Sequence, residues 1–312
     1  MAIWMLLAAT AGGASALINL GTGLGSPLAL VLSHLTHLPL FLAGLGIGAT
    51  GAIFAGGVGT LIVALVAGPY AALIFLAFDA VPVAVLCRQA LLSRSMPDGT
   101  QAWYPGGLLL TWLIGMAATY FLAVAAYFAL VHDGIHAAVR AALQGYFDAL
   151  GDLVPPENAE LLLALAPFVP GITASYLMLA IIINGALAQH LLRRSGRNLR
   201  PSVVFAEIVL PRGLLYLLGG AVVAAYLSGI FGQIALTLAF VAALAYFLLG
   251  LAVVHAFLRN RPNRGAALVS FYVVLLVLFS PVGLAVVGLG VVEQLVGLRH
   301  RFAPIAAGEE EE

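Results

Sequence analysis

Long apolar stretches follow one another along the chain, separated by short clusters of glycine, proline and charged residues. A bilayer core about 30 Å thick is crossed by a helix of about 20 apolar residues, and only helices or closed barrels satisfy their backbone there. The stretches are continuous rather than alternating, which excludes a barrel. We therefore predict an all-α, polytopic integral membrane helical bundle of about ten transmembrane helices, within a range of eight to ten. The ten segments are Ala2–Leu20, Pro27–Ile47, Ala49–Ala67, Pro69–Cys87, Tyr104–Val131, Glu160–Leu192, Gly213–Ser228, Ile230–Leu258, Gly265–Phe279 and Val282–Leu298.

The last two segments surround Ser280-Pro281, which indicates either a tight hairpin or a kink within one long span. A straight helix from Gly265 to Leu298 would measure about 51 Å at about 1.5 Å per residue, too long for one crossing without extreme tilt. The length therefore favours the hairpin.

The orientation follows from arginine, because cytoplasmic loops of membrane proteins retain the positive charge. All 13 basic residues are arginine, and 12 of them follow the even-numbered segments, with Arg140 as the exception. This alternation predicts cytoplasmic N- and C-termini in a bacterial inner membrane.

The composition excludes several classes of protein. The chain is 63% hydrophobic and 8% charged, against about 25% charged residues in soluble domains. The formal net charge is zero, which provides no basic face for nucleic acid. Cys87 is the single cysteine, and no Cys/His spacing of the zinc type occurs, so neither a disulfide framework nor a metal site is expected. The composition leaves any cofactor unknown.

One long segment, 132–159, falls on the predicted outer side. Apolar residues recur in it every three or four positions and polar residues lie opposite, which is the pattern of an amphipathic helix. This helix either lies in the membrane interface, or extends the fifth span, or covers an outward cavity as a lid. The apolar positions are Ile135, Val139, Leu143, Phe147 and Leu150, and the polar ones are His136, Arg140, Gln144, Asp148 and Asp152.

Three regions result from this pattern. Residues 1–192 form an N-terminal transmembrane bundle that includes the outward segment, and residues 193–302 form the C-terminal transmembrane helices. Residues 303–312 form an acidic tail that we expect to be solvated.

No catalytic motif is present: the chain has no P-loop, no Gly-x-Ser-x-Gly and no His-Glu-x-x-His, so we do not expect an enzyme. An intramembrane lipid enzyme would have only Asp79 and the histidines as acid or base. The informative residues are ionisable groups at membrane depth, which are costly and usually face a cavity or a partner. Asp79, in the fourth segment, either binds a ligand, ion or proton or forms a structural bond, for instance to a carbonyl freed by Pro82.

Other polar residues in the segments leave similar alternatives. His34 and His37 share one helical face, and either hold a metal or haem with a third ligand, line a polar cavity, or bond to other helices. Asn184 is typical of an interhelical bond, and Glu293 lies close enough to Arg299 to reach the interface. We group Asp79, His34, His37, Asn184 and Glu293 as candidate ligand-binding residues. Ala8, Gly12 and Ala16 form a small-residue stripe for close helix contact, within the chain or with a membrane protein partner subunit.

Several strings in the chain resemble one family. They are Leu6–Leu17, Leu38–Gly46, Trp103-Tyr104-Pro105, Asn184–Arg197 and Tyr246–His255. Together they are similar to the YybS-like predicted membrane proteins, grouped as domain of unknown function 2232, a resemblance that implies no established activity. This family is remotely similar, over its N-terminal spans, to the substrate-capturing membrane subunits of energy-coupling-factor vitamin transporters. That similarity implies a docking stripe at Ala8, Gly12 and Ala16 and an outward cavity under loops.

The cobalt and nickel versions of those subunits need a histidine where this chain has Ala2, so the same resemblance disfavours metal uptake.

Two functions follow from these observations. The first is a non-ATPase transport or ligand-binding subunit, which captures a small amphipathic molecule or lipid in a cavity lined by His34, His37 and Asp79. The alternative is a non-catalytic assembly or scaffold subunit of a larger membrane complex. In both cases the lipid bilayer surrounds the chain.

Overall fold

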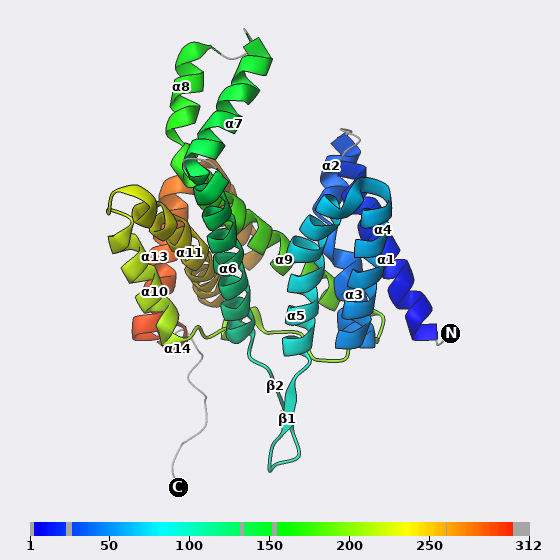
Figure 1. Ribbon diagram of the computed structural model, residues 1–312. Helices are drawn as coiled ribbons and strands as arrows, with labels where there is room; N and C mark the ends of the chain where they lie inside the picture. Colours follow the sequence, from blue (N-terminus) through cyan, green and yellow to red (C-terminus); the bar gives the residue numbers. More distant parts are fainter. Residues whose placement is uncertain (1–2, 23–26, 132–133, 152–154, 260, 302–312) are drawn as a thin grey trace. The chain divides into compact units, whose positions relative to one another are not determined.

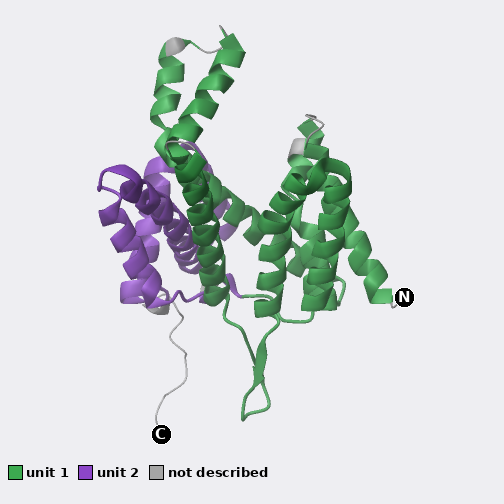
Figure 2. Ribbon diagram, in the orientation of Figure 1, with its two compact units in different colours: residues 1–203 green, residues 204–312 purple. Residues whose placement is uncertain are grey.

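The computed structural model describes residues 3–22, 27–131, 134–151, 155–259 and 261–301. The predicted tail at 303–312 and Asp152 lie outside this part of the chain. Two compact units are present, residues 1–203 and 204–312 (Figure 2). The predicted boundary at 192/193 falls in the last turn of a long helix, and the two units divide 11 residues later, between residues 203 and 204.

Within the described residues, seven helices are long and apolar enough to cross a membrane. They are Ile3–Gly21, Pro27–Ile47, Ala49–Ala90, Gly106–Val131, Glu157–Arg194, Gly229–Phe257 and Phe279–Val296, and two shorter apolar helices are Arg212–Ala224 and Arg264–Val277. The fold is therefore that of an all-α membrane protein.

Unit 1 begins with α1 (Ile3–Gly21), α2 (Pro27–Ser33), α3 (His37–Ile47), α4 (Ala49–Phe75), the π-helical turn η2 (Leu76–Ala80) and α5 (Val81–Ala90) (Figure 1).

The helix from Ala49 to Ala90 contains a reversal at Gly68. Gly68 has φ 89° and ψ 171°, a conformation that is essentially restricted to glycine. Beyond it the chain runs back along its own first half, because Gly56 faces Ala80 and Gly59 faces the ring of Phe75. The reversal lies between the segments predicted at Ala49–Ala67 and Pro69–Cys87.

The small-residue stripe of α1 is buried inside the chain. Ala8 and Ala16 have no exposed surface, and a Cβ at Gly12 would lie 2.1 Å from the backbone oxygen of Ala55 on α4. This close approach of α1 to α4 leaves no part of the stripe free for another subunit. The expectation that Ala8, Gly12 and Ala16 contact a partner is therefore corrected: they form a helix contact within unit 1.

The second half of unit 1 starts with a hairpin of two antiparallel strands, β1 (Ser93–Ser95) and β2 (Gln101–Trp103). The helices α6 (Gly106–Val131), α7 (Ile135–Leu150), α8 (Pro156–Ala164) and α9 (Val169–Arg194) follow, with the 3-10 turn η4 (Ala166–Phe168) before α9. The amphipathic pattern predicted in 132–159 corresponds to α7, and α7 has no buried residue.

Arg200 ties the segment after α9 to the end of α5. Its Nη1 donates a hydrogen bond to the carbonyl oxygen of Ala90 at 2.8 Å, and its guanidinium lies 5.9 Å from the ring centroid of Trp103. Gln189 Nε2 donates to the Arg200 carbonyl oxygen at 2.7 Å. Burial lowers the pKa of the Arg200 guanidinium, although arginine stays protonated in proteins. The buried cation thus satisfies a carbonyl that the end of a helix leaves unpaired.

We expect Arg200→Lys to destabilise unit 1 by about 2 kcal/mol, because an ammonium cannot reproduce the forked contacts of a guanidinium and hydrogen bonds from charged groups contribute about 1.5–3 kcal/mol. Arg197→Lys, at an exposed position of the same segment, is the control and should change nothing. The midpoint of thermal unfolding in detergent measures both, and equal midpoints would contradict the anchoring role of Arg200.

Unit 2 contains η5 (Phe205–Glu207), α10 (Arg212–Ala224), α11 (Gly229–Phe257), α12 (Arg264–Val277), α13 (Phe279–Val296) and α14 (Leu298–Arg301). The chain between Gly265 and Leu298 forms separate helices that part at Leu278, where φ is −112° and ψ is 45°. The break precedes Ser280-Pro281, because proline fits the first turn of a helix, where its missing N–H costs nothing.

Candidate functional site

The π-helical turn η2 places Asp79 beside His37 of α3. His37 Nε2 lies 3.3 Å from the carbonyl oxygen of Phe78 and 3.4 Å from Oδ1 of Asp79. Because a carbonyl oxygen only accepts hydrogen bonds, Nε2 carries a hydrogen and donates. In an α-helix the Phe78 carbonyl would accept from residue 82, and Pro82 has no N–H to donate. The sequence alternative of a bond to a carbonyl freed by Pro82 is thus realised, with His37 rather than Asp79 as the donor.

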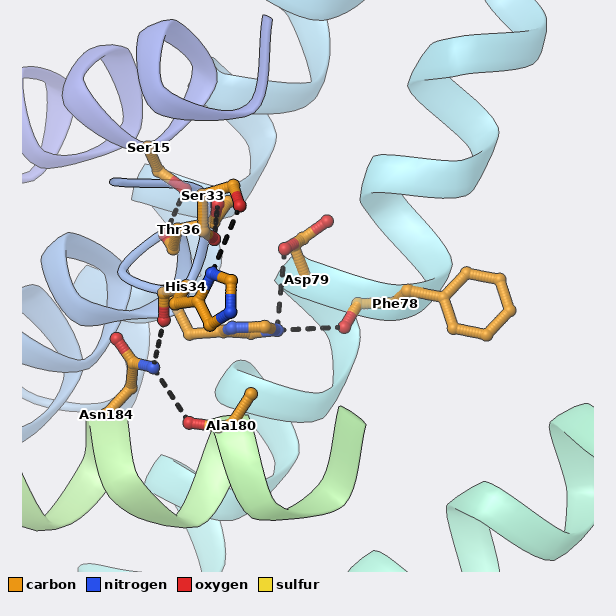
Figure 3. Close-up of polar contacts among 9 residues, drawn as sticks. Ser15, Ser33, His34, Thr36, Phe78, Asp79, Ala180 and Asn184 are labelled. Carbon is orange, nitrogen blue, oxygen red and sulfur yellow. Dashed lines mark hydrogen bonds and ion pairs between the residues drawn. The ribbon is translucent and has the colours of Figure 1, made fainter. Parts of the chain in front are cut away.

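The break between α2 and α3 is held by side chains from two other helices (Figure 3). Asn184 Nδ2, on α9, donates to the carbonyl oxygens of His34 and Ala180, both at 2.7 Å. Ser15 Oγ, on α1, donates to the Thr36 carbonyl oxygen at 2.7 Å. The bonds to His34 and Thr36 satisfy carbonyls in the break between α2 and α3, whereas Ala180 lies within α9. Asn184 therefore forms a hydrogen bond between α9 and the break that joins α2 to α3.

Two polar atoms in this region are buried without a hydrogen-bond partner among the described residues, Nδ1 of His37 and Oδ1 of Asn184. His37 and Asp79 are themselves buried, with 6% and 8% of their surface exposed. An unpartnered buried polar atom is rare and costs about 1–3 kcal/mol. We call His37, Asp79 and the Phe78 carbonyl the His37–Asp79 cluster.

A cavity of about 300 Å³ lies on the other side of η2. In Figure 3 the Phe78 ring points away from the His37–Asp79 cluster, and it lines this cavity together with Pro82. The ring of Phe78 lies 5.3 Å from that of Tyr120 between centroids. The remaining wall is almost wholly apolar and comes from α6, α7 and α9; it comprises Leu113, Met116, Ala117, Tyr120, Phe121, Val124, Ile135, Val139, Val169, Pro170, Thr173, Ala174, Leu177, Met178 and Ile181.

The structure corrects the cavity expected from the sequence. His34, His37 and Asp79 do not line it; the His34 ring packs edge-on against Tyr176, with 5.7 Å between centroids. The His37–Asp79 cluster and the cavity are therefore adjacent sites. Phe78 belongs to both, because its carbonyl oxygen is in the cluster and its side chain lines the cavity.

Glu293 belongs to a separate place, in unit 2. Its Oε1 accepts a hydrogen bond from Arg299 Nε at 2.6 Å, and its Oε2 accepts one from the Arg299 backbone N–H at 2.9 Å. Arg299 Nη2 also donates to the Ile208 carbonyl oxygen at 2.8 Å. Both carboxylate oxygens are occupied, and this corrects the grouping of Glu293 with ligand-binding residues: it closes the end of α13.

In the described part of the chain no group of three or more His, Cys, Asp or Glu side chains could hold a metal ion. His136 lies beside the cavity residues Ile135 and Val139 on α7. Both of its ring nitrogens are buried and have no hydrogen-bond partner in the described part of the chain. Burial lowers the pKa of His136 from its usual 6.5.

Sequence reasoning missed Phe78 and the cavity wall. A usable signal for Phe78 existed, because Pro82 removes the hydrogen-bond donor of the residue four positions before it. The other wall residues carry no local signal, since alanine, leucine and methionine at a cavity look the same in sequence as those facing lipid.

A family model described as "Predicted membrane protein (DUF2232)" matches residues 14–293. No curated protein and no solved structure matches the chain.

Proposed function

The chain belongs to the DUF2232 family of predicted membrane proteins, and on this premise we propose that it is a non-ATPase transport or ligand-binding subunit for a small amphipathic molecule or lipid. The observation that carries the proposal is the apolar cavity of about 300 Å³ in unit 1. Ligand cavities begin at about this volume and are mainly apolar with a few polar groups. The chain crosses a bacterial inner membrane about ten times, with both termini in the cytoplasm, and performs no catalysis.

The chemistry of the wall selects the ligand class. Thr173 and Tyr120 bring the hydroxyl groups in a lining that is otherwise aliphatic and aromatic. A strongly charged ligand would lose its hydration without gaining partners there. An acyl chain or another apolar body with one small polar end fits this lining.

The cavity can be filled by a single substitution. We expect Ala117→Phe to remove a molecule of a few hundred daltons that otherwise remains bound when the protein is extracted from its own membranes in mild detergent. Native mass spectrometry of the intact protein measures this as the loss of a discrete mass excess. Ala126→Phe is the matched control, because Ala126 is exposed on the same helix and does not line the cavity.

The result has three readable outcomes. A mass excess kept by Ala126→Phe and lost by Ala117→Phe supports the ligand-binding function, and the mass names the substrate class. Loss in neither variant assigns the bound molecule to the outer lipid-facing surface and contradicts the proposal. A stoichiometric protein partner without a small molecule favours the assembly subunit.

A further inference from the structure

The His37–Asp79 cluster combines two buried ionisable groups, and no arginine in the described part of the chain forms an ion pair with them. The elements that pack against η2 include α3, α4 and α5, and α6 reaches it through the ring of Tyr120. Beyond the pair, the ionisable side chains of α3, α4 and α5 are Tyr70, Cys87 and Arg88, and His34 lies three residues before His37. Tyr70 and Arg88 are exposed, and Cys87 is buried next to Gly44. Among the described residues, His37 is the ion-pair partner of Asp79.

The hydrogen bonds determine how many protons the cluster holds. Nε2 of His37 keeps its hydrogen, because it faces the Phe78 carbonyl and the Asp79 carboxylate. The variable proton therefore sits on Nδ1 of His37, which is buried without a partner, or on the carboxyl of Asp79. With that proton the pair has zero net charge, and without it the pair has a charge of minus one inside an apolar bundle. A buried charge without compensation is strongly unfavourable.

We propose that the His37–Asp79 cluster is a proton-binding site and that its proton occupancy is coupled to ligand occupancy of the neighbouring cavity. The coupling rests on the proposed function, because it needs a ligand in that cavity. Phe78 is the link: its carbonyl oxygen accepts the hydrogen bond from His37, and its ring forms the cavity wall.

The sign of the coupling follows from the charge. When water takes the variable proton, the buried negative charge draws water toward Asp79, and η2 must loosen from α3 to admit it. The Phe78 ring then leaves its place in the wall. A ligand in the cavity therefore binds more tightly to the protonated protein, and by linkage the ligand raises the affinity for the proton by the same factor.

The test uses N-phenyl-1-naphthylamine, a neutral fluorescent probe, with the full chain in mild detergent. Binding that is lost in Ala117→Phe and kept in Ala126→Phe is counted as cavity binding. We expect the affinity of the cavity for the probe to fall at least about fivefold as pH rises from about 5 to 8. A roughly fivefold change is the low end of typical coupling between two sites. Asp79→Asn, which mimics the protonated acid in size and charge, should bind tightly at every pH.

Two control variants separate other causes of pH dependence. Asp98→Asn removes an exposed acid of the β1–β2 turn, and His136→Gln removes the titratable group beside the cavity; both should keep the wild-type profile. A profile that Asp79→Asn leaves unchanged, or that His136→Gln flattens, overturns the coupling while leaving cavity binding intact.

Infrared spectroscopy tests the proton site without a ligand. A buried Asp79 carboxyl that gains its proton gives a carbonyl stretch that is absent in Asp79→Asn, and a proton on His37 gives imidazolium bands that are absent in His37→Gln. One of these signals should appear as pH falls. If neither signal titrates, the proton site is overturned. If one titrates but no probe binding depends on the cavity, the proton site stands and the proposed function and the coupling fail.

Discussion

Gly290→Ala is expected to destabilise unit 2 by about 3 kcal/mol, the upper end of the cost of overpacking a core. A Cβ at Gly290 of α13 would lie 2.0 Å from the backbone oxygen of Tyr246 on α11. On the same interface, a Cβ at Gly250 would lie 1.9 Å from the backbone oxygen of Val286. The added Cβ would clash with a backbone atom, which cannot rotate away as a side chain can, so α13 must move away from α11 where the two helices cross.

The thermal unfolding midpoint of the purified protein should fall by about 12 °C, given about 4 °C per kcal/mol for a unit of this size. Gly288→Ala on the same helix is the control, because its Cβ would meet nothing within 4 Å. Alanine is the better helix former by about 1 kcal/mol, so this variant should match or exceed the wild type. Equal losses in both variants would contradict this prediction, because only Gly290 lies at the close helix crossing.

The small-residue contacts show where sequence reasoning stops. The stripe in α1 is visible in the sequence, but its partner is not, because many alanine and glycine positions have the same spacing in this chain. The structure joins Gly12 to Ala55 and Gly290 to Tyr246, pairs that are distant along the chain. Close helix contacts need a matching surface on another helix, and only the packed bundle reveals which surface that is.

The helix boundaries were more accessible to prediction. The sequence placed a break between Ala67 and Pro69, and the structure has a reversal at Gly68, because proline and glycine act locally. The π-helical turn at Leu76–Ala80 was not foreseen. At this turn His37 of α3 donates to the Phe78 carbonyl oxygen, which Pro82 leaves without its usual helical donor. Asp79 and His37 were identified individually for their cost at membrane depth, whereas their contact required the fold.

Glu293 shows the same limit in a different way. Its spacing from Arg299 suggested only that it could reach the interface, but the structure buries it, with 4% of its side chain exposed. Both carboxylate oxygens face Arg299, since Gly297 ends α13 in the left-handed conformation, with φ 68°, and returns the chain toward it. A turn of that kind brings residues six apart together, which helical periodicity alone does not predict.

Arg299→Met is therefore expected to destabilise unit 2 by about 3–5 kcal/mol, the cost of leaving a buried charge without its partner. The Ile208 carbonyl oxygen would lose its donor in the same variant. Arg259→Met, at an exposed position, should unfold at the wild-type temperature and controls for the loss of a positive charge. Thermal unfolding in mild detergent measures all variants.

The double variant Glu293→Gln with Arg299→Met decides whether the unpaired charge is the cause. Glutamine has no charge to leave uncompensated. Its side-chain oxygen can still accept the hydrogen bond that the backbone N–H of residue 299 donates to Glu293 Oε2, at 2.9 Å, in the wild-type protein. We expect the double variant to recover more than half of the loss, because replacing both members of a buried pair costs far less than removing one. If Arg299→Met alone costs less than about 1 kcal/mol, the pair behaves as a solvated surface contact, and α13 then ends at the interface without a buried charge.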